Sequence, residues 1–175
     1  EFKMLEDAGL NASSSSVMKV AAKSCKYKKF NERGLFLSEH RRCYDEIIDY
    51  CNKLVYNGNL EPMRGSGKSD KKLAIKKWPQ MGIRQVDTER SVKKGISRIN
   101  LNEAKEIASW IQDNFQFIAE SYPNEPQKNL VGIITPFKAQ VNCIKRKLSN
   151  KFPQVSVGTV HTFQGAERKI IILST

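Results

Sequence analysis

The fold is decided by residues 130–148, which read LVGIITPFKAQVNCIKRKL. Residues 130–134 form an apolar run that is typical of a buried β-strand. Thr135 and Pro136 follow, and they suit the start of a helix because threonine can cap a helix and proline fits its first position. Apolar side chains then recur at spacings of four, three and four residues, at Phe137, Val141, Ile144 and Leu148. A buried strand that leads directly into an amphipathic helix predicts an α/β fold.

Upstream of this unit, the chain repeats the order of strand and helix. Residues 34–37 form a short apolar run that predicts a strand. Residues 47–55 carry apolar side chains at helical spacing, and the turn signal Asn57-Gly58 ends that predicted helix. A second strand and helix are therefore expected here.

Two further signals complete the pattern. Asn100 and Glu103 have the spacing of a capping box, so another helix is expected to begin there and to carry an apolar stripe as far as residue 118. Residues 155–160 and 169–174 predict two strands on either side of a short polar loop. Because strands alternate with helices, we expect an α/β fold with a mostly parallel sheet and helices on both of its faces.

The charge of the chain favours a polyanionic partner. Thirty Lys and Arg against 18 Asp and Glu give the 175 residues a formal net charge of +12. Residues 64–98 contain 11 of the basic residues and three acidic ones, so this basic segment alone has a net charge of +8. The segment is either a surface for a phosphate backbone or a solvated insertion, and the sequence leaves both interpretations open.

The sequence gives no sign of a metal, disulfide or membrane site. Its four cysteines lack paired spacing, and we expect them to be reduced thiols. His40 and Cys43 are three residues apart, but a closed zinc site needs four ligands. No apolar run approaches the roughly 20 residues of a membrane span, and the first thirty residues do not resemble a secretory signal. We therefore expect a cytoplasmic or nuclear protein, and of the two we choose cytoplasmic.

Residues 65–69 read GSGKS and look like the end of a phosphate-binding P-loop. The motif requires a glycine five residues before Gly67, where this chain has Pro62, and it requires a buried strand before the loop. We interpret the segment as a flexible loop. A P-loop kinase built on Lys68 and Ser69 is the alternative.

Three segments carry a more specific signal. Residues 37–60 read LSEHRRCYDEIIDYCNKLVYNGNL, residues 132–140 read GIITPFKAQ, and residues 157–169 read VGTVHTFQGAERK. In this order they resemble the motifs of superfamily 1 helicases of the nonsense-decay and replication helicase/nuclease type. The resemblance covers the second RecA-like domain, over roughly residues 33–175.

The resemblance implies roles in an ATP site. It assigns Arg42 to the arginine that contacts the γ-phosphoryl group, where a guanidinium stabilises developing charge. It assigns Gln164, Gly165 and Glu167 to the nucleotide, with Glu167 on the ribose hydroxyls. Arg41 stands where the family has an aromatic residue near the adenine, and a guanidinium can also stack on a base. The alternatives are that Arg42 pairs with Glu39 or Asp45, and that Glu167 is a solvated acid beside Arg168 and Lys169.

The resemblance also implies a nucleic-acid track. It places Thr135, Pro136, Thr159 and His161 on a single strand of DNA or RNA, because hydroxyls and amides at strand ends can hold phosphate oxygens. For Thr135, a helix cap is the structural alternative. For His161, it is a structural histidine.

The family's motor needs two lobes, and three of the family's motifs are absent from these residues. The Walker lysine, the Mg²⁺-binding acid and a final V-A-x-[ST]-R motif do not occur. We expect a piece of a longer enzyme: a helical lead-in from the linker between lobes at residues 1–32, and the second RecA-like domain at 33–175, with a basic insertion or loop at 62–99. ATP and Mg²⁺ would be held mainly by the first RecA-like lobe, and the isolated chain would not hydrolyse ATP. The competing interpretation is a non-enzymatic nucleic-acid-binding module.

Overall fold

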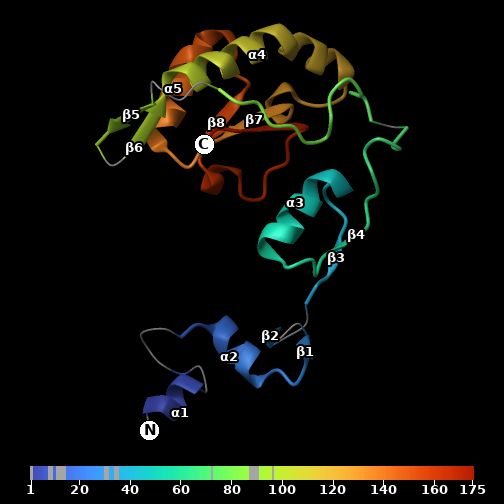
Figure 1. Cartoon of the computed structure of the whole chain (residues 1–175), viewed down its shortest axis with the longest axis vertical. Helices are drawn as coiled ribbons and strands as arrows, with labels where there is room; N and C mark the ends of the chain where they lie inside the picture. The colour runs from blue at the N-terminus through green and yellow to red at the C-terminus, as the bar shows by residue number, and fades with distance from the viewer. Residues whose placement is uncertain are drawn as a thin grey trace. The chain divides into compact units, whose positions relative to one another are not determined.

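The structure is a computed structural model, and it describes residues 2–7, 10, 15–29, 32–33, 36–71, 73–86, 91–95 and 97–175. The chain divides into two compact units. The first comprises Glu1–Leu73 with Pro79–Met81, and the second comprises Ala74–Trp78 with Gly82–Thr175. Figure 1 shows the elements of both. The predicted boundary between a helical lead-in at residues 1–32 and a domain at residues 33–175 stays a prediction.

The second unit is built on a parallel three-stranded sheet in the order β8-β7-β9. The central strand is β7 (Val131–Ile134), which pairs with β8 (Ser156–Gly158) and with β9 (Ile170–Leu173). Ile133 lies opposite Val157 on one side and Ile172 on the other. The three predicted strands are thus present and parallel.

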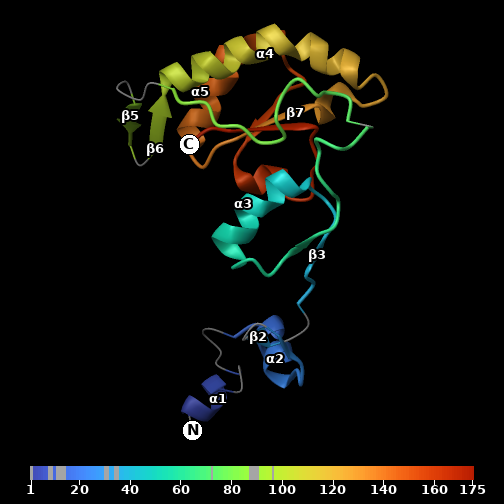
Figure 2. The same ribbon diagram turned by 45° about the vertical axis from the view of Figure 1, so that its right-hand side comes forward.

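Two long helices cover one face of this sheet. They are α4 (Leu101–Ser121) and α5 (Lys138–Leu148), which Figures 1 and 2 show on the same side of β7. Their apolar stripes join the strands in one core, which includes Ile111, Ile118, Ile133 and Ile144, each fully buried. Area buried in this way is the main favourable term for the unit.

The opposite face of the sheet is covered by the crossover from β8 to β9. This segment contains the short 3-10 helix η3 (Val160–Phe163), which appears in red below the sheet in Figure 2. Phe163 is buried there, and a Cβ atom added to Gly132 would lie 2.6 Å from its ring. The absence of a side chain at Gly132 therefore lets the aromatic ring rest on the strand. The predicted α/β architecture with a parallel sheet is confirmed.

The start of α4 agrees with the sequence, whereas the start of α5 does not. The Asn100 side chain accepts a hydrogen bond from the Glu103 N–H at 3.0 Å and caps α4. For α5, however, the N-cap is Phe137, and Pro136 lies before the helix. The Thr135 N–H continues the sheet by donating to the Gly158 carbonyl at 3.1 Å, so the chain leaves the strand later than predicted.

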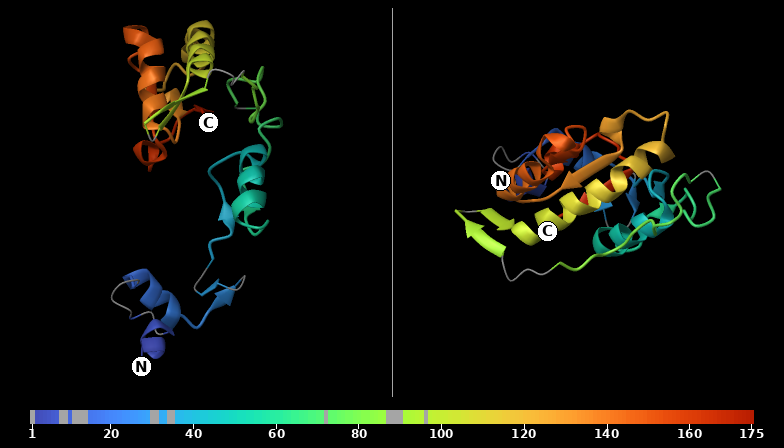
Figure 3. Two further views of the ribbon diagram at one scale, coloured as in Figure 1. Left: turned by 60° about the vertical axis from the view of Figure 1, so that its left-hand side comes forward. Right: turned by 90° about the horizontal axis from the view of Figure 1, so that it is seen from above.

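The basic segment contains a hairpin that the sequence did not indicate. Strands β5 (Ser91–Lys94) and β6 (Ser97–Asn100) are antiparallel, and β6 leads directly into α4, as Figure 3 shows. Earlier in the segment, Ile75 is buried in the core, and Trp78 packs on Trp110 with ring centroids 5.1 Å apart. The segment is therefore anchored on α4 at some points and exposed at others.

The first unit consists of short elements. They are α1 (Phe2–Asp7), α2 (Val17–Ser24), β1 (Lys28–Lys29), β2 (Glu32–Arg33), β3 (Glu39–His40), α3 (Asp45–Val55) and β4 (Glu61–Pro62). The remaining 3-10 turns, in the second unit, are η1 (Gln127–Asn129) and η2 (Ser149–Lys151). In the described part of the chain, no helix is long and apolar enough to cross a membrane.

The predicted strand at residues 34–37 is wrong where it can be compared. Gly34 and Leu35 lie outside the described residues, and Phe36 and Leu37 have no regular structure. The strand lies at Glu39–His40, where β3 pairs in parallel with β4. The helix that follows, α3, is present and ends at Val55, and the expected turn follows at Asn57 and Gly58, whose φ angles are 51° and 77°.

Candidate functional site

Two candidate nucleic-acid residues lie at the carboxyl ends of neighbouring strands. Thr135 directly follows β7, and Thr159 directly follows β8. The hydrogen bond from the Thr135 N–H to the Gly158 carbonyl holds the two strand ends together. Ligands of open α/β sheets bind outside this edge, so the fold itself brings both threonines to the appropriate place.

The two threonines differ in their surroundings. Thr135 is fully buried, and its hydroxyl accepts a hydrogen bond from the Phe137 N–H at 3.3 Å. Its side chain therefore stabilises the turn between β7 and α5. This is a structural role similar to the helix cap that was the alternative for Thr135. Pro136 is exposed, Thr159 is half-buried at the N-cap of η3, and His161 is exposed on η3.

The candidate nucleotide-binding residues follow η3 in an exposed loop. Gln164, Gly165 and Glu167 are all exposed, and Gly165 has a φ of 73°, a conformation that favours glycine. No atom lies within 4 Å of a Cβ built on Gly165, so the backbone borders open space. The loop thus offers an amide, a carboxylate and an approachable backbone to a ligand.

Arg168, which is half-buried, supports this loop. Its guanidinium donates to the Glu167 carbonyl at 2.7 Å and to the Ser156 hydroxyl at 3.2 Å, and it lies 5.5 Å from the Phe163 ring centroid. The next residue, Lys169, forms an ion pair with Glu125 at 2.6 Å. This role of Arg168 was not predicted, because charged residues in a polar loop look solvated in the sequence.

Arg41 and Arg42 belong to the first unit, and the other seven candidate residues belong to the second. Both arginines are exposed on the turn between β3 and α3. The Arg41 guanidinium pairs with the Glu39 carboxylate at 2.7 Å. An exposed pair of this kind contributes at most about 1 kcal/mol, so it would give way readily to a ligand.

The GSGKS segment is occupied by carboxylates from the start of α3. The Gly65 N–H donates to Asp45 Oδ1, and the Gly67 N–H donates to Glu46 Oε2, each at 3.1 Å. The Ser66 hydroxyl also donates to Glu46, and this bond, with the backbone amides, holds the pKa of the Glu46 carboxyl below its usual value. The segment is a loop, as expected, and the amides that a phosphate would need are bound to protein carboxylates, which speaks against the P-loop alternative.

Gln140 is a central residue whose role was not predicted. It is 2% exposed, and its side-chain oxygen accepts from the Asn100 N–H at 2.9 Å. Its amide group donates to the Asn100 carbonyl, the Glu103 carboxylate and the Ser174 hydroxyl. Its place at the end of the segment GIITPFKAQ, which resembles a helicase motif, was the available signal.

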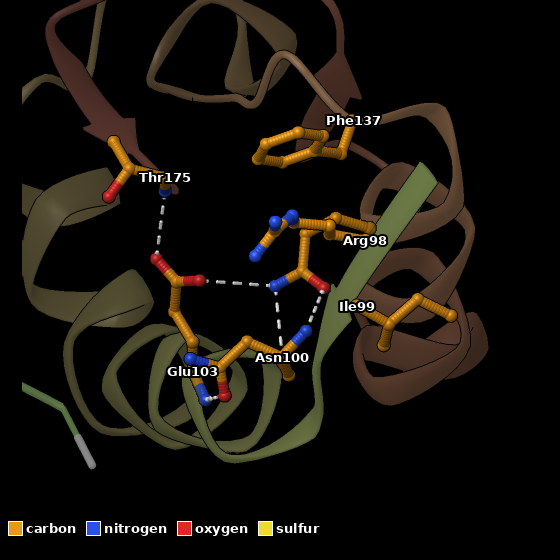
Figure 4. A pocket seen from close by; sticks show the side chains of 7 residues that line it. Arg98, Ile99, Asn100, Glu103, Phe137 and Thr175 are labelled. Atoms are coloured by element: carbon orange, nitrogen blue, oxygen red, sulfur yellow. Dashed lines mark hydrogen bonds between the residues drawn. The ribbon is translucent and has the colours of Figure 1, made fainter. Parts of the chain in front are cut away.

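The Gln140 network borders a cavity of about 520 Å³. Figure 4 shows the Phe137 ring and the Arg98 side chain facing the same space as Glu103, whose carboxylate accepts from the Thr175 N–H at 3.1 Å. The cavity is thus lined by an aromatic ring, a cation and an anion.

No group of three or more His, Cys, Asp or Glu residues in the described ranges could hold a metal ion. The two residues considered for a metal are joined in a turn, where His40 Nε2 accepts from the Cys43 N–H at 3.0 Å.

The parallel sheet, the strand-end threonines and the loop after η3 agree with a RecA-like domain of the superfamily 1 helicase type, which comparison with known proteins supports. A model of the AAA domain matches residues 14–175, and the chain belongs to that family. Helicase sen1 of Schizosaccharomyces pombe is 23% identical over 176 residues, which cover 95% of this chain and 10% of that protein. The mouse 5'-3' DNA helicase ZGRF1 is 29% identical over 80% of this chain and 7% of its own length.

Human RNA helicase Mov10l1 is 26% identical over 79% of this chain and 12% of its own length. The matched parts of these three relatives are at most 12% of their lengths. The chain therefore corresponds to a small portion of the helicases it resembles.

Proposed function

We propose that this chain is the second motor lobe of an ATP-dependent superfamily 1 helicase that acts on single-stranded DNA or RNA. The observation that carries the proposal is the junction of Thr135 and Thr159 at the carboxyl ends of β7 and β8. Both threonines belong to segments that resemble helicase motifs. The names of the relatives include a DNA helicase and an RNA helicase, so both nucleic acids are candidates.

The proposed strand track runs over Thr135, Pro136, Thr159 and His161. Backbone amides and hydroxyls at this edge would hold phosphate oxygens, which fixes the register of a strand without reading its sequence. Exposed lysines of the basic segment would add affinity that depends on salt. In this proposal the residues at the strand ends position the nucleic acid for translocation, and the lysines of the basic segment attract it without sequence preference.

Several groups of the chain suit parts of ATP. The Glu167 carboxylate suits the ribose hydroxyls, Gln164 and the open backbone at Gly165 suit the close approach of the nucleotide, and the Arg42 guanidinium suits a phosphoryl group that develops charge. Arg41 would contact the adenine through its guanidinium plane. The first lobe would hold Mg²⁺ and most of the triphosphate, and closure of the lobes around ATP would change the grip on the strand.

The test uses Arg42→Ala in the full-length protein. We expect ATP hydrolysis to be abolished while binding of a single strand persists, because the arginine would act on the phosphoryl group alone. Lys53→Ala is the control, since Lys53 forms an exposed ion pair with Asp49 on α3 in the same unit. Unchanged ATP turnover in Arg42→Ala would contradict the proposal. The isolated chain should show no turnover above that of a denatured sample.

The net charge of +12 supports one alternative, a non-enzymatic nucleic-acid-binding module on the same fold. The reading frame around this chain distinguishes the two. An upstream G-x-x-x-x-G-K-[ST] with a D-E pair, and a downstream V-A-x-[ST]-R, support the motor, and their absence supports the module. In both cases we place the protein in the cytoplasm, which imaging of a tagged full-length protein would test.

A further inference from the structure

The pairing of β3 with β4 brings residue 64 next to the turn that carries Arg42. Glu39 lies opposite Glu61, and His40 lies opposite Pro62, in parallel register. The Met63 N–H extends this ladder by donating to the His40 carbonyl at 2.8 Å. Because the two segments run in the same direction, Arg64 follows the ladder at the point where the Arg42 turn begins.

Arg64 contacts the turn on both sides of Cys43. Its guanidinium donates a hydrogen bond to the Arg42 carbonyl, and the same group lies 4.4 Å from the centroid of the Tyr44 ring. A planar guanidinium is suited to this combination, since it can donate in its plane and stack with its face. One side chain thus fixes both the backbone of Arg42 and the ring of Tyr44.

The Tyr44 ring, which the Arg64 guanidinium contacts, is itself fixed by a hydrogen bond. Its hydroxyl donates to Asp70 Oδ2 at 2.8 Å. Burial, and next the bond to Asp70, raise the pKa of the Tyr44 hydroxyl above its usual value. The ring therefore presents a fixed face to the guanidinium.

The loop after Arg64 closes on the start of α3. The Asp45 N–H donates to the Gly65 carbonyl at 3.2 Å, and the Gly65 N–H returns a bond to Asp45 Oδ1. Ser66 and Gly67 bind the Glu46 carboxylate in the same way. Residues 64–67 therefore contact the chain at residue 42 and at residues 44–46. The Arg42 side chain itself is exposed.

We propose that Arg64 is a positioning residue that orients Arg42 through its carbonyl and through Tyr44. The inference rests on the proposed role of Arg42 in ATP hydrolysis. A guanidinium that stabilises a transition state must be placed before the reaction, and misplacement by about 1 Å can cost on the order of a hundredfold in rate. The glycine-serine loop, which resembles a phosphate site, thus serves to hold an arginine.

The first test measures ATP hydrolysis by the full-length protein. Arg64→Gln should lower kcat about tenfold or more with little change in KM, and Tyr44→Leu should do the same because it removes the stacking surface. Lys53→Gln removes an equal charge from an exposed pair in the same unit and should match the wild type. Arg64→Lys should recover part of the rate, because it keeps the cation and loses the fork.

A double variant separates this inference from the proposed function. If Arg64 acts through Arg42, Arg42→Ala with Arg64→Gln should be no slower than Arg42→Ala alone. Loss of activity in Arg42→Ala, combined with wild-type rates in Arg64→Gln, would overturn the positioning role only. Wild-type rates in Arg42→Ala would overturn the proposed function instead.

The second test uses the 175-residue chain and does not depend on activity. Amide hydrogen exchange in Arg64→Gln should become faster for residues 39–46 and should stay unchanged in α4. Acceleration over the whole chain would show a general structural role for Arg64, and no acceleration at residues 39–46 would show that it does not hold the turn. Either result would overturn the proposal.

Discussion

The side chain of Gln140 pairs with the backbone of Asn100 in both directions, accepting at 2.9 Å and donating at 3.2 Å. Gln140 lies on α5, and Asn100 caps α4, so this buried pair joins the two helices that cover the sheet. The same amide donates to the Ser174 hydroxyl beyond β9. One glutamine therefore sets the relative position of α4, α5 and the end of a strand.

Replacing Gln140 by leucine should lower the free energy of unfolding by about 2 kcal/mol, because the Asn100 N–H would remain buried without its acceptor. Urea denaturation of the chain measures this. Gln116→Leu is the matched control, since Gln116 is exposed on α4 and donates to Glu120 on the surface of the helix, and it should change stability by less than about 0.5 kcal/mol. Equal losses in the two variants would show that the pair is not important.

Gly132→Ala should destabilise the second unit by about 1–3 kcal/mol, because its Cβ would meet the Phe163 ring at 2.6 Å. Phe163→Leu should relieve part of this conflict by removing ring atoms. In a double-mutant cycle followed by thermal denaturation, we therefore expect the two substitutions together to cost less than their sum. Additive costs would mean that η3 moves away from the sheet freely.

Stability should depend on the ionisation of Glu46. Its pKa is lowered in the folded chain, first by the Ser66 hydroxyl and then by backbone amides. The ionised carboxylate therefore stabilises the folded state above the unfolded pKa, and this contribution is lost as the pH falls through the lower folded value. Urea denaturation from about pH 7 to about pH 3 should show that Glu46→Gln is less stable near neutrality and that the difference shrinks in acid.

Ser66→Ala offers a check on the cause of this dependence. Removing the hydroxyl donor should bring the pKa of Glu46 partly back toward its usual value, so the pH dependence should be weaker than in the wild type. A difference between wild type and Glu46→Gln that is the same at every pH would contradict the assignment.

The basic segment should control the salt dependence of strand binding. Lys71, Lys76 and Lys93 are exposed, and changing all three to Gln should reduce the slope of log affinity against log salt by about 2, since each phosphate contact on a single strand contributes about 0.7. The control changes Lys53, Lys128 and Lys151, which are exposed outside the segment. Titration of a single-stranded oligonucleotide measures both sets. Equal slopes would mean that net charge, and not this segment, attracts the strand.

The regular elements were predictable where local pattern and burial agree. The strand at β7 and the stripes of α4 and α5 follow from spacing alone, because their apolar side chains are buried. The helix α3 was also predicted from spacing, although Leu54 and Val55 of its stripe are exposed. The β5–β6 hairpin was not predicted, because its strands contain lysine and arginine and each has a single apolar side chain. The strand placed at residues 34–37 failed because an apolar run does not by itself provide a pairing partner.

The site was predictable to the extent that motifs mark it. Thr135 and Thr159 were found from their segments, but the bond that joins their strand ends depends on the order β8-β7-β9. Gln140, Arg168 and Arg64 act through partners that are 12 to 40 residues away in sequence, as in the contacts with Ser156, Arg42 and Asn100. No local sequence pattern indicates which residues so far apart in the sequence will be in contact.

Periodicity, composition and spacing are local properties, and they were enough to predict the α/β class, the surplus of positive charge and the segments that resemble helicase motifs. Which groups are in contact depends on the fold. The letters GSGKS suggest a phosphate site, but the amides of Gly65 and Gly67 donate hydrogen bonds to carboxylates of α3. Hydrogen-bond partners are chosen by the packing of distant segments, and that packing gives the same residues an anchoring role around Arg42.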